Sequence, residues 1–315
     1  MRELRIVFMG TPDFAVSSLK ALEESEWKVV GVITAPDRKA GRGRKLQSSA
    51  VKQYAESVGL PVLQPTNLKD ESFIDELKAL KPNLQVVVAF RMLPEVVWRL
   101  PEYGTFNLHA SLLPQYRGAA PINWAVIQGE QESGVTTFYI DDKIDTGDLL
   151  LQARAPIEKT DTAGTLHDRL AALGSRLVLE TVEAIAADQI TPQPQRASEV
   201  LRAAPKLNKD NTRIDWDAPA TVVYNFIRGL SPYPAAWSAL DQDGELLPVK
   251  IYKVSFTESQ LSAVPGTLQI ENNTLLVAVA DGCLQIDELQ LPGKRKMNSK
   301  DLLNGFEFKE NAILR

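Results

Sequence analysis

The chain has 315 residues, of which 44% are hydrophobic, and this length and composition predict a globular protein of about two domains. Its formal net charge of -5 at pH 7 argues against a protein that coats nucleic acid non-specifically, because such binding needs lysine and arginine to neutralise phosphates. A local basic patch is still compatible with that charge. The single cysteine, Cys283, excludes an intramolecular disulfide and a cysteine-rich zinc site, and with two histidines we expect no metal centre.

The first residues of the sequence lead directly into a strand-like run, without the long apolar segment of a signal peptide. No stretch approaches the roughly 18 uncharged apolar residues that a membrane-spanning helix needs. We therefore expect a cytoplasmic protein that does not bind membranes.

In chain order, the pattern of apolar residues alternates between strands and helices. Strands are expected at 4–9, 29–33, 62–63, 84–90, 105–110 and 135–140, and helices from Phe14 onward and at 49–58, 72–80 and 165–187. The last helix has one continuous apolar face. Such alternation predicts a Rossmann-like, doubly wound, mainly parallel sheet with helices on both faces.

The second part of the chain has a different pattern. Three prolines among polar residues predict an extended linker at 188–205, between a catalytic domain at 1–187 and a C-terminal domain at 206–315. After a helix at 220–229, short strands are expected at 237–240, 249–256, 267–270, 275–279 and 284–289. This spacing predicts a small OB-like β-barrel, with Trp216 and Trp237 in its core.

The most informative motif is Asn107-Leu108-His109, at the expected end of a strand. Alternation along a strand puts Asn107 and His109 on the same side. Ligands of open α/β sheets bind outside the carboxyl ends of the strands, where this pair would lie. Because a lone histidine beside apolar residues is more often structural than catalytic, the functional interpretation depends on a second motif.

That second motif is the acidic turn 141–148, Asp-Asp-Lys-Ile-Asp-Thr-Gly-Asp, directly after an apolar strand. Its other interpretations are a helix cap, a solvated turn or a cation loop. The positions of its glycine and of the next glutamate argue against a calcium loop of the EF-hand type. We favour a carboxylate partner for His109.

Together these motifs resemble the signature of the folate-dependent formyltransferases, an Asn-x-His strand end followed by Ser-Leu-Leu-Pro and later by Asp-x-x-x-Asp-Thr-Gly. The matching residues are Asn107, His109, Ser111 to Pro114, Asp141 and Asp145 to Gly147. The resemblance to members that act on methionine attached to initiator tRNA extends from Gly10-Thr11-Pro12-Asp13-Phe14 through Ile214-Asp215-Trp216 to Asp301-Leu302-Leu303-Asn304.

The resemblance implies transfer of the formyl group of 10-formyltetrahydrofolate to the free amino group of methionyl initiator tRNA, for translation initiation, without metal or nicotinamide. It also implies that Asn107, His109 and Asp145 form the catalytic group. The substrate amine is the nucleophile, and its ordinary pKa of roughly 7.7 to 8.0 leaves a neutral fraction near pH 7. Asn107 and a protonated His109 would donate to the oxygen of the tetrahedral intermediate, while Asp145 would orient His109 and take up the amine proton.

The folate pocket that the resemblance implies is formed by two segments. They contribute Ser111, Leu112, Leu113 and Pro114, and Phe90, Arg91 and Met92. Segment 89–94, Ala-Phe-Arg-Met-Leu-Pro, is one residue shorter than the commoner family form, which has a glycine after the aromatic residue. The pterin contacts of 90–92 therefore depend on how this shortened segment folds.

Residues 38–45 form a glycine-containing segment with five lysines and arginines among eight positions. In isolation, a nuclear-localisation signal or a solvated loop explains it as well as a binding loop does. In the resembling family this loop meets the acceptor arm of the tRNA, which implies contacts for Arg38, Arg42, Arg44 and Lys45, with most weight on Arg42. Lys206 and the basic run 294–296 are weaker candidates for phosphate contacts.

Four other functions compete with this interpretation. A sugar-nucleotide formyltransferase shares the catalytic trio and can carry a similar second domain, but the basic segment favours tRNA. A purine-pathway formyltransferase is typically a single domain, which leaves the last hundred or so residues unexplained. A non-catalytic nucleic-acid-binding protein does not need the intact trio, and a nicotinamide-dependent oxidoreductase does not fit the turn 10–13, which lacks the Gly-x-Gly-x-x-Gly spacing. We expect the protein to act as a monomer.

Overall fold

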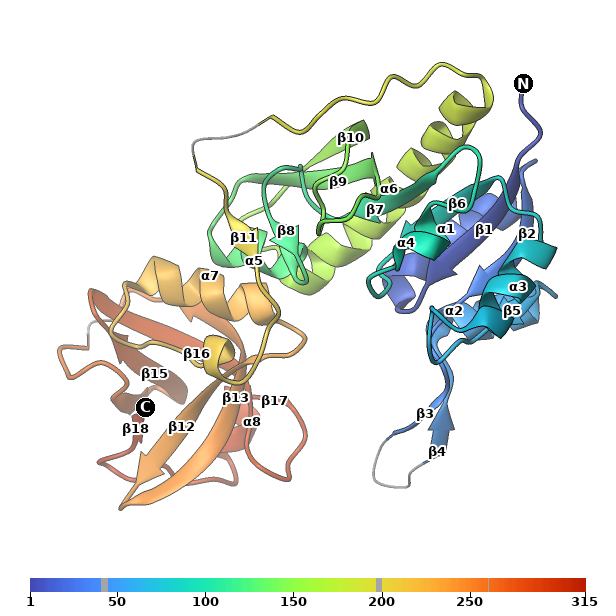
Figure 1. Ribbon diagram of the computed structural model, residues 1–315. Coiled ribbons are helices and arrows are strands. Elements are labelled where there is room, and N and C mark those ends of the chain that lie inside the picture. Colours follow the sequence, from blue (N-terminus) through green and yellow to red (C-terminus); the bar gives the residue numbers. More distant parts are fainter. Residues whose placement is uncertain (41–44, 197–199, 260) are drawn as a thin grey trace. The chain divides into compact units, whose positions relative to one another are not determined.

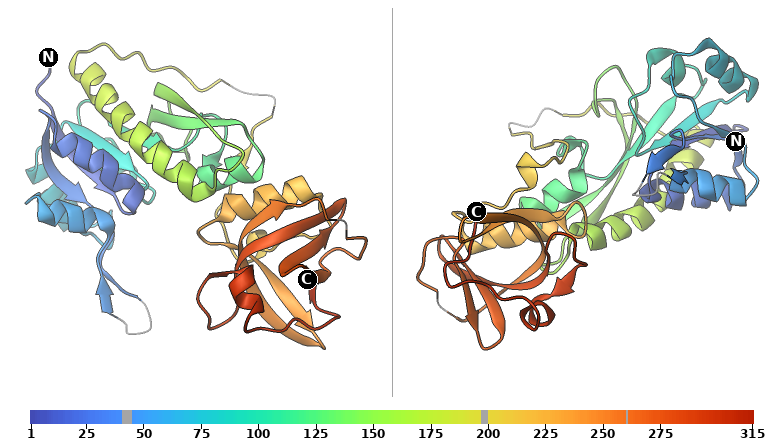
Figure 2. Two further views of the ribbon diagram at one scale, coloured as in Figure 1. Left: turned by 180° about the vertical axis from the view of Figure 1, so that it is seen from behind. Right: turned by 90° about the horizontal axis from the view of Figure 1, so that it is seen from below.

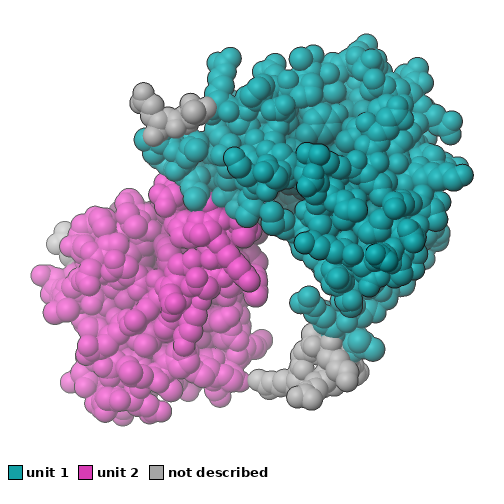
Figure 3. Space-filling model, in the orientation of Figure 1, with its two compact units in different colours: residues 1–118, 132–156, 167–203 teal, residues 119–131, 157–166, 204–315 magenta. Residues whose placement is uncertain are grey.

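The computed structural model describes residues 1–40, 45–196, 200–259 and 261–315, with residues 39, 40 and 45 described by their backbone alone (Figure 1). Its contacts divide the chain into two compact units, which Figure 3 colours separately. Unit 1 comprises Met1–Gly118, Glu132–Pro156 and His167–Ala203, and unit 2 comprises Ala119–Gln131, Ile157–Leu166 and Ala204–Arg315. In the part of the chain that is described, no helix is long and apolar enough to cross a bilayer.

A seven-stranded sheet forms the frame of unit 1. Its order is β10 (Leu149–Pro156), β9 (Glu132–Tyr139), β7 (Thr105–His109), β6 (Leu84–Val88), β1 (Arg5–Gly10), β2 (Lys28–Ile33) and β5 (Val62–Leu63). The strands from β7 to β5 are parallel, whereas β9 and β10 are antiparallel at one edge. The chain leaves β1 first toward β2 and later toward β6, so the sheet is doubly wound and the predicted fold class is confirmed.

Helices cover both faces of this sheet (Figure 2). They are α1 (Asp13–Glu23), α2 (Ala50–Ser57), α3 (Glu71–Ala79), α4 (Glu95–Trp98) and α6 (Ala163–Ala186). One core cluster joins Val7 and Met9 of β1 to Leu77 of α3 and Val97 of α4. Because neighbouring strand residues point to opposite faces, the intervening Phe8, which is fully buried, faces the other helices.

Side-chain caps fix where the helices of unit 1 begin. Ser49 accepts a hydrogen bond from the main-chain nitrogen of Lys52 at the start of α2 (3.0 Å), and Asp70 accepts one from Ser72 at the start of α3 (3.0 Å). Such caps satisfy main-chain donors that the first helical turn leaves unpaired, and each contributes about 1 kcal/mol. The Asp70 cap fixes the point at which the loop 64–70 enters α3.

Unit 2 is built on an antiparallel sheet. Its order is β14 (Leu268–Glu271), β15 (Thr274–Val279), β16 (Gly282–Gln290), β13 (Glu245–Phe256), β12 (Ala236–Gln242) and β18 (Ile313–Leu314), and β17 (Met297–Asn298) also pairs with β16. A bridge between Thr267 and Ile313 joins the two ends of this order, which closes the sheet into the predicted OB-like barrel.

The remaining elements of the chain are short or pack on the barrel. They are α5 (Pro121–Ile127), α7 (Ala220–Leu230), α8 (Ser299–Leu303), the 3-10 helix η1 (Asp210–Thr212), and the strands β3 (Arg38–Ala40), β4 (Lys45–Gln47), β8 (Arg117–Gly118) and β11 (Ala203–Ala204). Trp216 lies in the core of unit 2, as predicted, together with Ile227 of α7 and Ile251 of β13. Trp237 is half-buried, so its predicted place in the core is wrong.

Candidate active site

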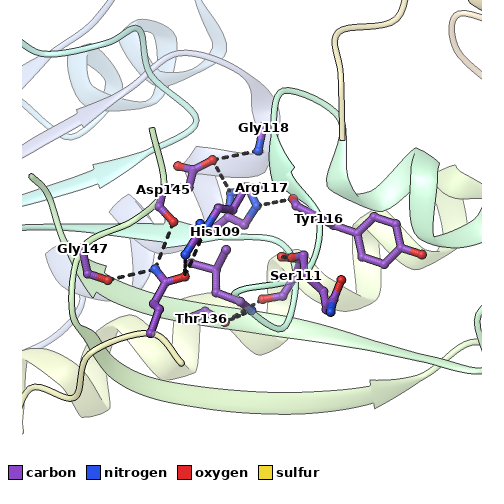
Figure 4. Close-up of polar contacts among 11 residues, drawn as sticks. His109, Ser111, Tyr116, Arg117, Gly118, Thr136, Asp145 and Gly147 are labelled. Carbon is purple, nitrogen blue, oxygen red and sulfur yellow. Dashed lines mark hydrogen bonds and ion pairs between the residues drawn. The ribbon is translucent and has the colours of Figure 1, made fainter. Parts of the chain in front are cut away.

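His109 is the last residue of β7, and its side chain is buried (Figure 4). Its Nε2 lies 2.8 Å from the main-chain oxygen of Tyr116. Because a carbonyl oxygen accepts hydrogen bonds and does not donate them, this contact assigns a proton to Nε2 and leaves Nδ1 for other partners. Asn107 stands two residues earlier on the same face of the strand and is half-buried.

Asp145 approaches His109 from the loop between β9 and β10. Its Oδ2 accepts a hydrogen bond from the main-chain nitrogen of Gly118 (2.9 Å) and lies 3.8 Å from Nδ1 of His109 (Figure 4). The second distance is that of an ion pair and exceeds that of a direct hydrogen bond. The side chains of His109 and Asp145 are 7% and 15% exposed, so this carboxylate and imidazole interact where water screens them weakly.

The loop that carries Asp145 runs back along β7. Ile140 donates to the main-chain oxygen of Thr105, at the start of β7 (2.9 Å), whereas Asp145 reaches His109 at the end of the same strand. Asn107 occupies the middle of the strand, between these two points. The structure therefore brings His109 and Asp145 together, as predicted. It puts Asn107 on the same face of β7 as His109.

Three features shape the turn around Asp145. Asp145 has a φ of 55°, in the left-handed region that is uncommon for residues other than glycine. Thr146 donates through its hydroxyl to the carboxylate of Asp141 (2.9 Å), which closes the turn. A Cβ atom on Gly147 would collide with the main-chain oxygen of Tyr139, so the glycine of the Asp-Thr-Gly motif is required by this close approach.

We expect Gly147→Ala to lower kcat by about 10- to 100-fold, because a displaced turn moves Asp145 away from His109. The overpacked backbone contact is also expected to reduce the free energy of unfolding by about 1–3 kcal/mol. Steady-state kinetics and chemical denaturation measure the two effects. Gly305→Ala is the control, because a Cβ there meets open space. Wild-type kinetics for Gly147→Ala would show that the turn tolerates displacement.

A cavity of about 520 Å³ lies in unit 1, lined by segments 66–69 and 91–95, by Trp98 and by the acidic pair Asp141 and Asp142. Asp141 also closes the turn of Asp145, so the cavity and the histidine–aspartate pair share one loop. Of the residues predicted for the folate pocket, Arg91 and Met92 line this cavity.

Arg91 connects segment 89–94 to a neighbouring loop. Its guanidinium donates to the main-chain oxygen of Thr66 (2.9 Å) and to that of Pro65, and its Cζ lies 5.7 Å from the centre of the Phe90 ring. Phe90 in turn packs partly against the core beneath. Arg91 therefore ties the segment to the loop after β5, and this wall of the cavity is fixed by contacts within the protein.

Two ionisable side chains near the site have shifted pKa values. Desolvation of the partly covered Arg91 guanidinium lowers its pKa, and the positive charge of Arg38 lowers it further. Arginine nevertheless stays protonated at neutral pH, because its ordinary pKa is far above 7. Burial raises the pKa of the Tyr116 hydroxyl, which stays neutral at pH 7 and points away from His109, whose contact with Tyr116 is to the main-chain oxygen (Figure 4). Within the described residues, no group of three or more His, Cys, Asp or Glu side chains is placed to hold a metal ion.

Polar groups of segment 111–114 form hydrogen bonds within the protein. The Ser111 hydroxyl donates to the main-chain oxygen of Gln115 (2.6 Å), and the nitrogen of Leu113 donates to the Thr136 hydroxyl (3.2 Å). Ser111 and Leu113 are buried, whereas Leu112 and Pro114 are half-buried. Folate contacts of this segment remain a prediction.

The basic segment is only partly described. Arg38 is exposed and begins β3, which pairs with β4 in antiparallel register, so the ends of the predicted loop are strands. Arg42 and Arg44 lie outside the described residues, and Lys45 is described by its backbone. Lys206, the other residue predicted to contact tRNA, is exposed in unit 2.

A second cavity, of about 640 Å³, lies in unit 2 and was not predicted from the sequence. It is lined by Trp237, by Tyr233, which is 81% exposed, and by Lys209 and Lys250. The Nζ of Lys209 and the Cζ of Arg213 lie 5.2 and 5.6 Å from the Trp237 ring centre. The sequence contains a weak signal for this cavity, because the basic residues Lys209 and Arg213 precede Trp237 near the start of a strand.

Comparison with known proteins agrees with this geometry. Residues 4–182 match the family model described as formyl transferase, and residues 206–307 match the formyl transferase C-terminal domain. The class defined by the doubly wound domain and its histidine–aspartate site is thus the formyl transferases. The chain is 55% identical over 312 residues to the methionyl-tRNA formyltransferase of Parabacteroides distasonis, covering 97% of this chain and 96% of that protein. The chain belongs to the methionyl-tRNA formyltransferase family.

Solved structures with lower identity share the fold. HypX from Aquifex aeolicus, in complex with tetrahydrofolic acid, has a TM-score of 0.66 at 18% identity, and the match covers 96% of this chain and 47% of HypX. An N-formyltransferase from Helicobacter canadensis, in complex with folinic acid and dTDP-3-aminofucose, has a TM-score of 0.64 at 21% identity and covers 94% of this chain and 100% of that one. At these identities the likeness supports the fold class.

Proposed function

We propose that this protein, acting as a monomer, transfers the formyl group of 10-formyltetrahydrofolate to the free amino group of methionyl initiator tRNA. The observation that carries the proposal is the weakly screened pair of His109 and Asp145, beside a cavity, in a chain 55% identical to a methionyl-tRNA formyltransferase. Transfer between two nitrogens needs no nucleophile from the protein, and the site has the groups that such a reaction requires.

In the proposed mechanism the methionyl amine attacks the formyl carbon, a carbon–nitrogen bond forms, and the carbonyl oxygen becomes an oxyanion. The Asn107 amide and a proton on Nδ1 of His109 donate to that oxygen, because Nε2 is engaged by Tyr116. Asp145 accepts the proton that the amine loses, directly or through a water. The intermediate then collapses as the bond to N10 of the folate breaks, and N10 takes up the proton that Asp145 accepted.

The cavity beside Arg91 and Met92 supports a folate site in unit 1. The carboxylates of Asp141 and Asp142 can accept hydrogen bonds from the amino and ring N–H groups of a pterin, and the apolar walls can cover its ring. We assign Phe90 and segment 111–114 to the same site. Phe90 supports the guanidinium of Arg91, and Leu112 and Pro114 are the half-buried residues of their segment.

The remaining assignments concern tRNA and the division of the chain. We propose a catalytic domain at 1–187, a linker at 188–205 and a tRNA-binding domain at 206–315. The exposed Lys206 and the cavity of Lys209 and the exposed Tyr233 support this role, because lysines attract phosphates and exposed aromatic rings can stack on bases. Arg38, Arg42, Arg44 and Lys45 are assigned to the acceptor arm.

Arg42→Leu is expected to weaken the binding of charged tRNA by about tenfold and to reduce the slope of log affinity against log salt by about 1. The physical reason is the loss of one phosphate-neutralising side chain. Titrations of methionyl initiator tRNA at several salt concentrations measure both effects. Arg154→Leu is the matched control, since Arg154 is a surface residue of β10 paired with Glu132. An unchanged affinity and slope for Arg42→Leu would assign the tRNA contact elsewhere.

The function is tested by incubating the protein with labelled 10-formyltetrahydrofolate and three acceptors, namely methionyl initiator tRNA, uncharged tRNA and an amino-sugar nucleotide. Label on methionyl-tRNA alone is the expected result. Label on the amino sugar would make the protein a sugar-nucleotide formyltransferase. No transfer to any acceptor would support a binding protein without this activity.

A further inference from the structure

Gln195 lies in the segment that follows α6, which composition alone predicts to be a linker on the surface. The structure packs its beginning against unit 1, where the main chain of Gln193 pairs with Leu149 in both directions (2.8 and 2.9 Å). Two residues later the half-buried side chain of Gln195 reaches the turn of Asp145. Its Nε2 donates to the main-chain oxygens of Asp145 (3.0 Å) and Gly147 (2.9 Å).

The other end of the same amide binds Arg117. Oε1 of Gln195 accepts from Nη2 (2.6 Å) and Nε (3.2 Å) of Arg117. A glutamine amide has two N–H donors and an oxygen with two lone pairs, so all its hydrogen-bonding capacity is used. Because carbonyl oxygens accept and guanidinium groups donate, one orientation of the amide satisfies all of these partners.

These partners control the position of the Asp145 carboxylate from two sides. Two contacts hold the backbone of the turn at Asp145 and Gly147. The other two hold Arg117, whose neighbour Gly118 donates to Oδ2 of Asp145 (2.9 Å), as Figure 4 shows. The turn needs such support, because Asp145 has a φ of 55°, and uncommon backbone conformations persist where the surroundings over-determine them.

We infer that Gln195 is a positioning residue of the formyl-transfer site, which acts on the reaction by holding Asp145 beside His109. The inference rests on the proposed function. It makes the segment after α6 a part of the catalytic apparatus. A purely structural role, in which Gln195 fastens this segment to unit 1, predicts a loss of stability with an intact reaction step.

The test compares Gln195→Leu and Gln195→Glu with Gln193→Leu, whose side chain is exposed and whose pairing uses the main chain. Gln195→Leu removes all the contacts. Gln195→Glu keeps the size of the side chain and its acceptor for Arg117, but it puts a carboxylate oxygen against two carbonyl oxygens. Thermal unfolding of each variant shows whether it folds. If Gln195→Leu does not fold, Gln195→Glu alone tests the inference.

For both Gln195 variants we expect kcat to fall about 10- to 100-fold, with both KM values within about twofold of wild type. Gln195→Glu is expected to lose at least as much as Gln195→Leu, while Gln193→Leu keeps wild-type kinetics. The decisive measurement adds Gln195→Leu to Asp145→Asn under single-turnover conditions. If Gln195 acts through Asp145, the added loss is expected to be less than about twofold.

Three results would overturn the inference while leaving the proposed function intact. They are kcat values for the Gln195 variants that match Gln193→Leu, a rise in KM without a fall in kcat, and an equal loss in the wild-type and Asp145→Asn backgrounds. If the wild-type protein transfers no formyl group to any acceptor, the proposed function fails and the inference fails with it.

Discussion

His109→Ala is expected to lower kcat by about 10²- to 10⁴-fold, the usual contribution of a side chain that donates or transfers a proton in a transition state. The imidazole has one nitrogen on the Tyr116 carbonyl (2.8 Å) and the other toward Asp145 (3.8 Å), so its ring is held in one orientation. Alanine leaves the oxyanion without this donor and the carboxylate without its partner. Single-turnover transfer at saturating folate and tRNA measures the effect.

The chain offers a matched control in its other histidine. His167 lies on α6, where its ring meets the Phe14 ring edge-on at 5.2 Å and its Nδ1 lies 2.9 Å from Asp168. His167→Ala is therefore expected to keep wild-type kcat and KM. A rate within about threefold of wild type for His109→Ala would remove His109 from the mechanism, because general acid–base groups contribute far more than that.

Much of the fold follows from local sequence, because the central strands are buried on both sides. The strand β6 has five consecutive buried residues, four of them apolar, and a buried run of this kind followed by a helix predicts a parallel sheet. Strand β10 was not predicted, because it lies at an edge and exposed residues such as Arg154 interrupt its apolar pattern. Strands β3 and β4 were not predicted either. Their basic and polar sequence is typical of a solvated loop, whereas the pairing that defines them is between main-chain groups.

The site was predictable in part. Motif spacing, together with the family resemblance, indicated that His109 and Asp145 belong together, and the structure places them 3.8 Å apart. The spacing of the motifs does not give the path of the loop that carries Asp145. This loop runs back along β7, and its path depends on the close approach of Gly147 to the Tyr139 oxygen. Main-chain donors such as Gly118 leave no mark in a sequence, because every residue except proline has the same N–H group.

Asp145→Asn is the second change with a large expected effect, a fall in kcat of about 10³-fold with little change in KM. The asparagine keeps the size of the side chain and an oxygen that can accept from Gly118, so the turn is expected to stay in place. It removes the negative charge beside His109 and the acceptor for the amine proton. The loss therefore reports the charge of the carboxylate, separately from the position of the loop.

Asp168→Asn is the control for Asp145→Asn, since Asp168 is also next to a histidine but lies at the surface, with a side chain 85% exposed. Water screens that pair, so its charge contributes little and wild-type kinetics are expected. Equal, small effects of the two substitutions would mean that the buried charge has no part in the reaction. A large fall in kcat for Asp145→Asn alone, with an unchanged unfolding temperature, would instead show that the rate depends on this one carboxylate. Its position in turn depends on Gly118, Gly147 and Gln195.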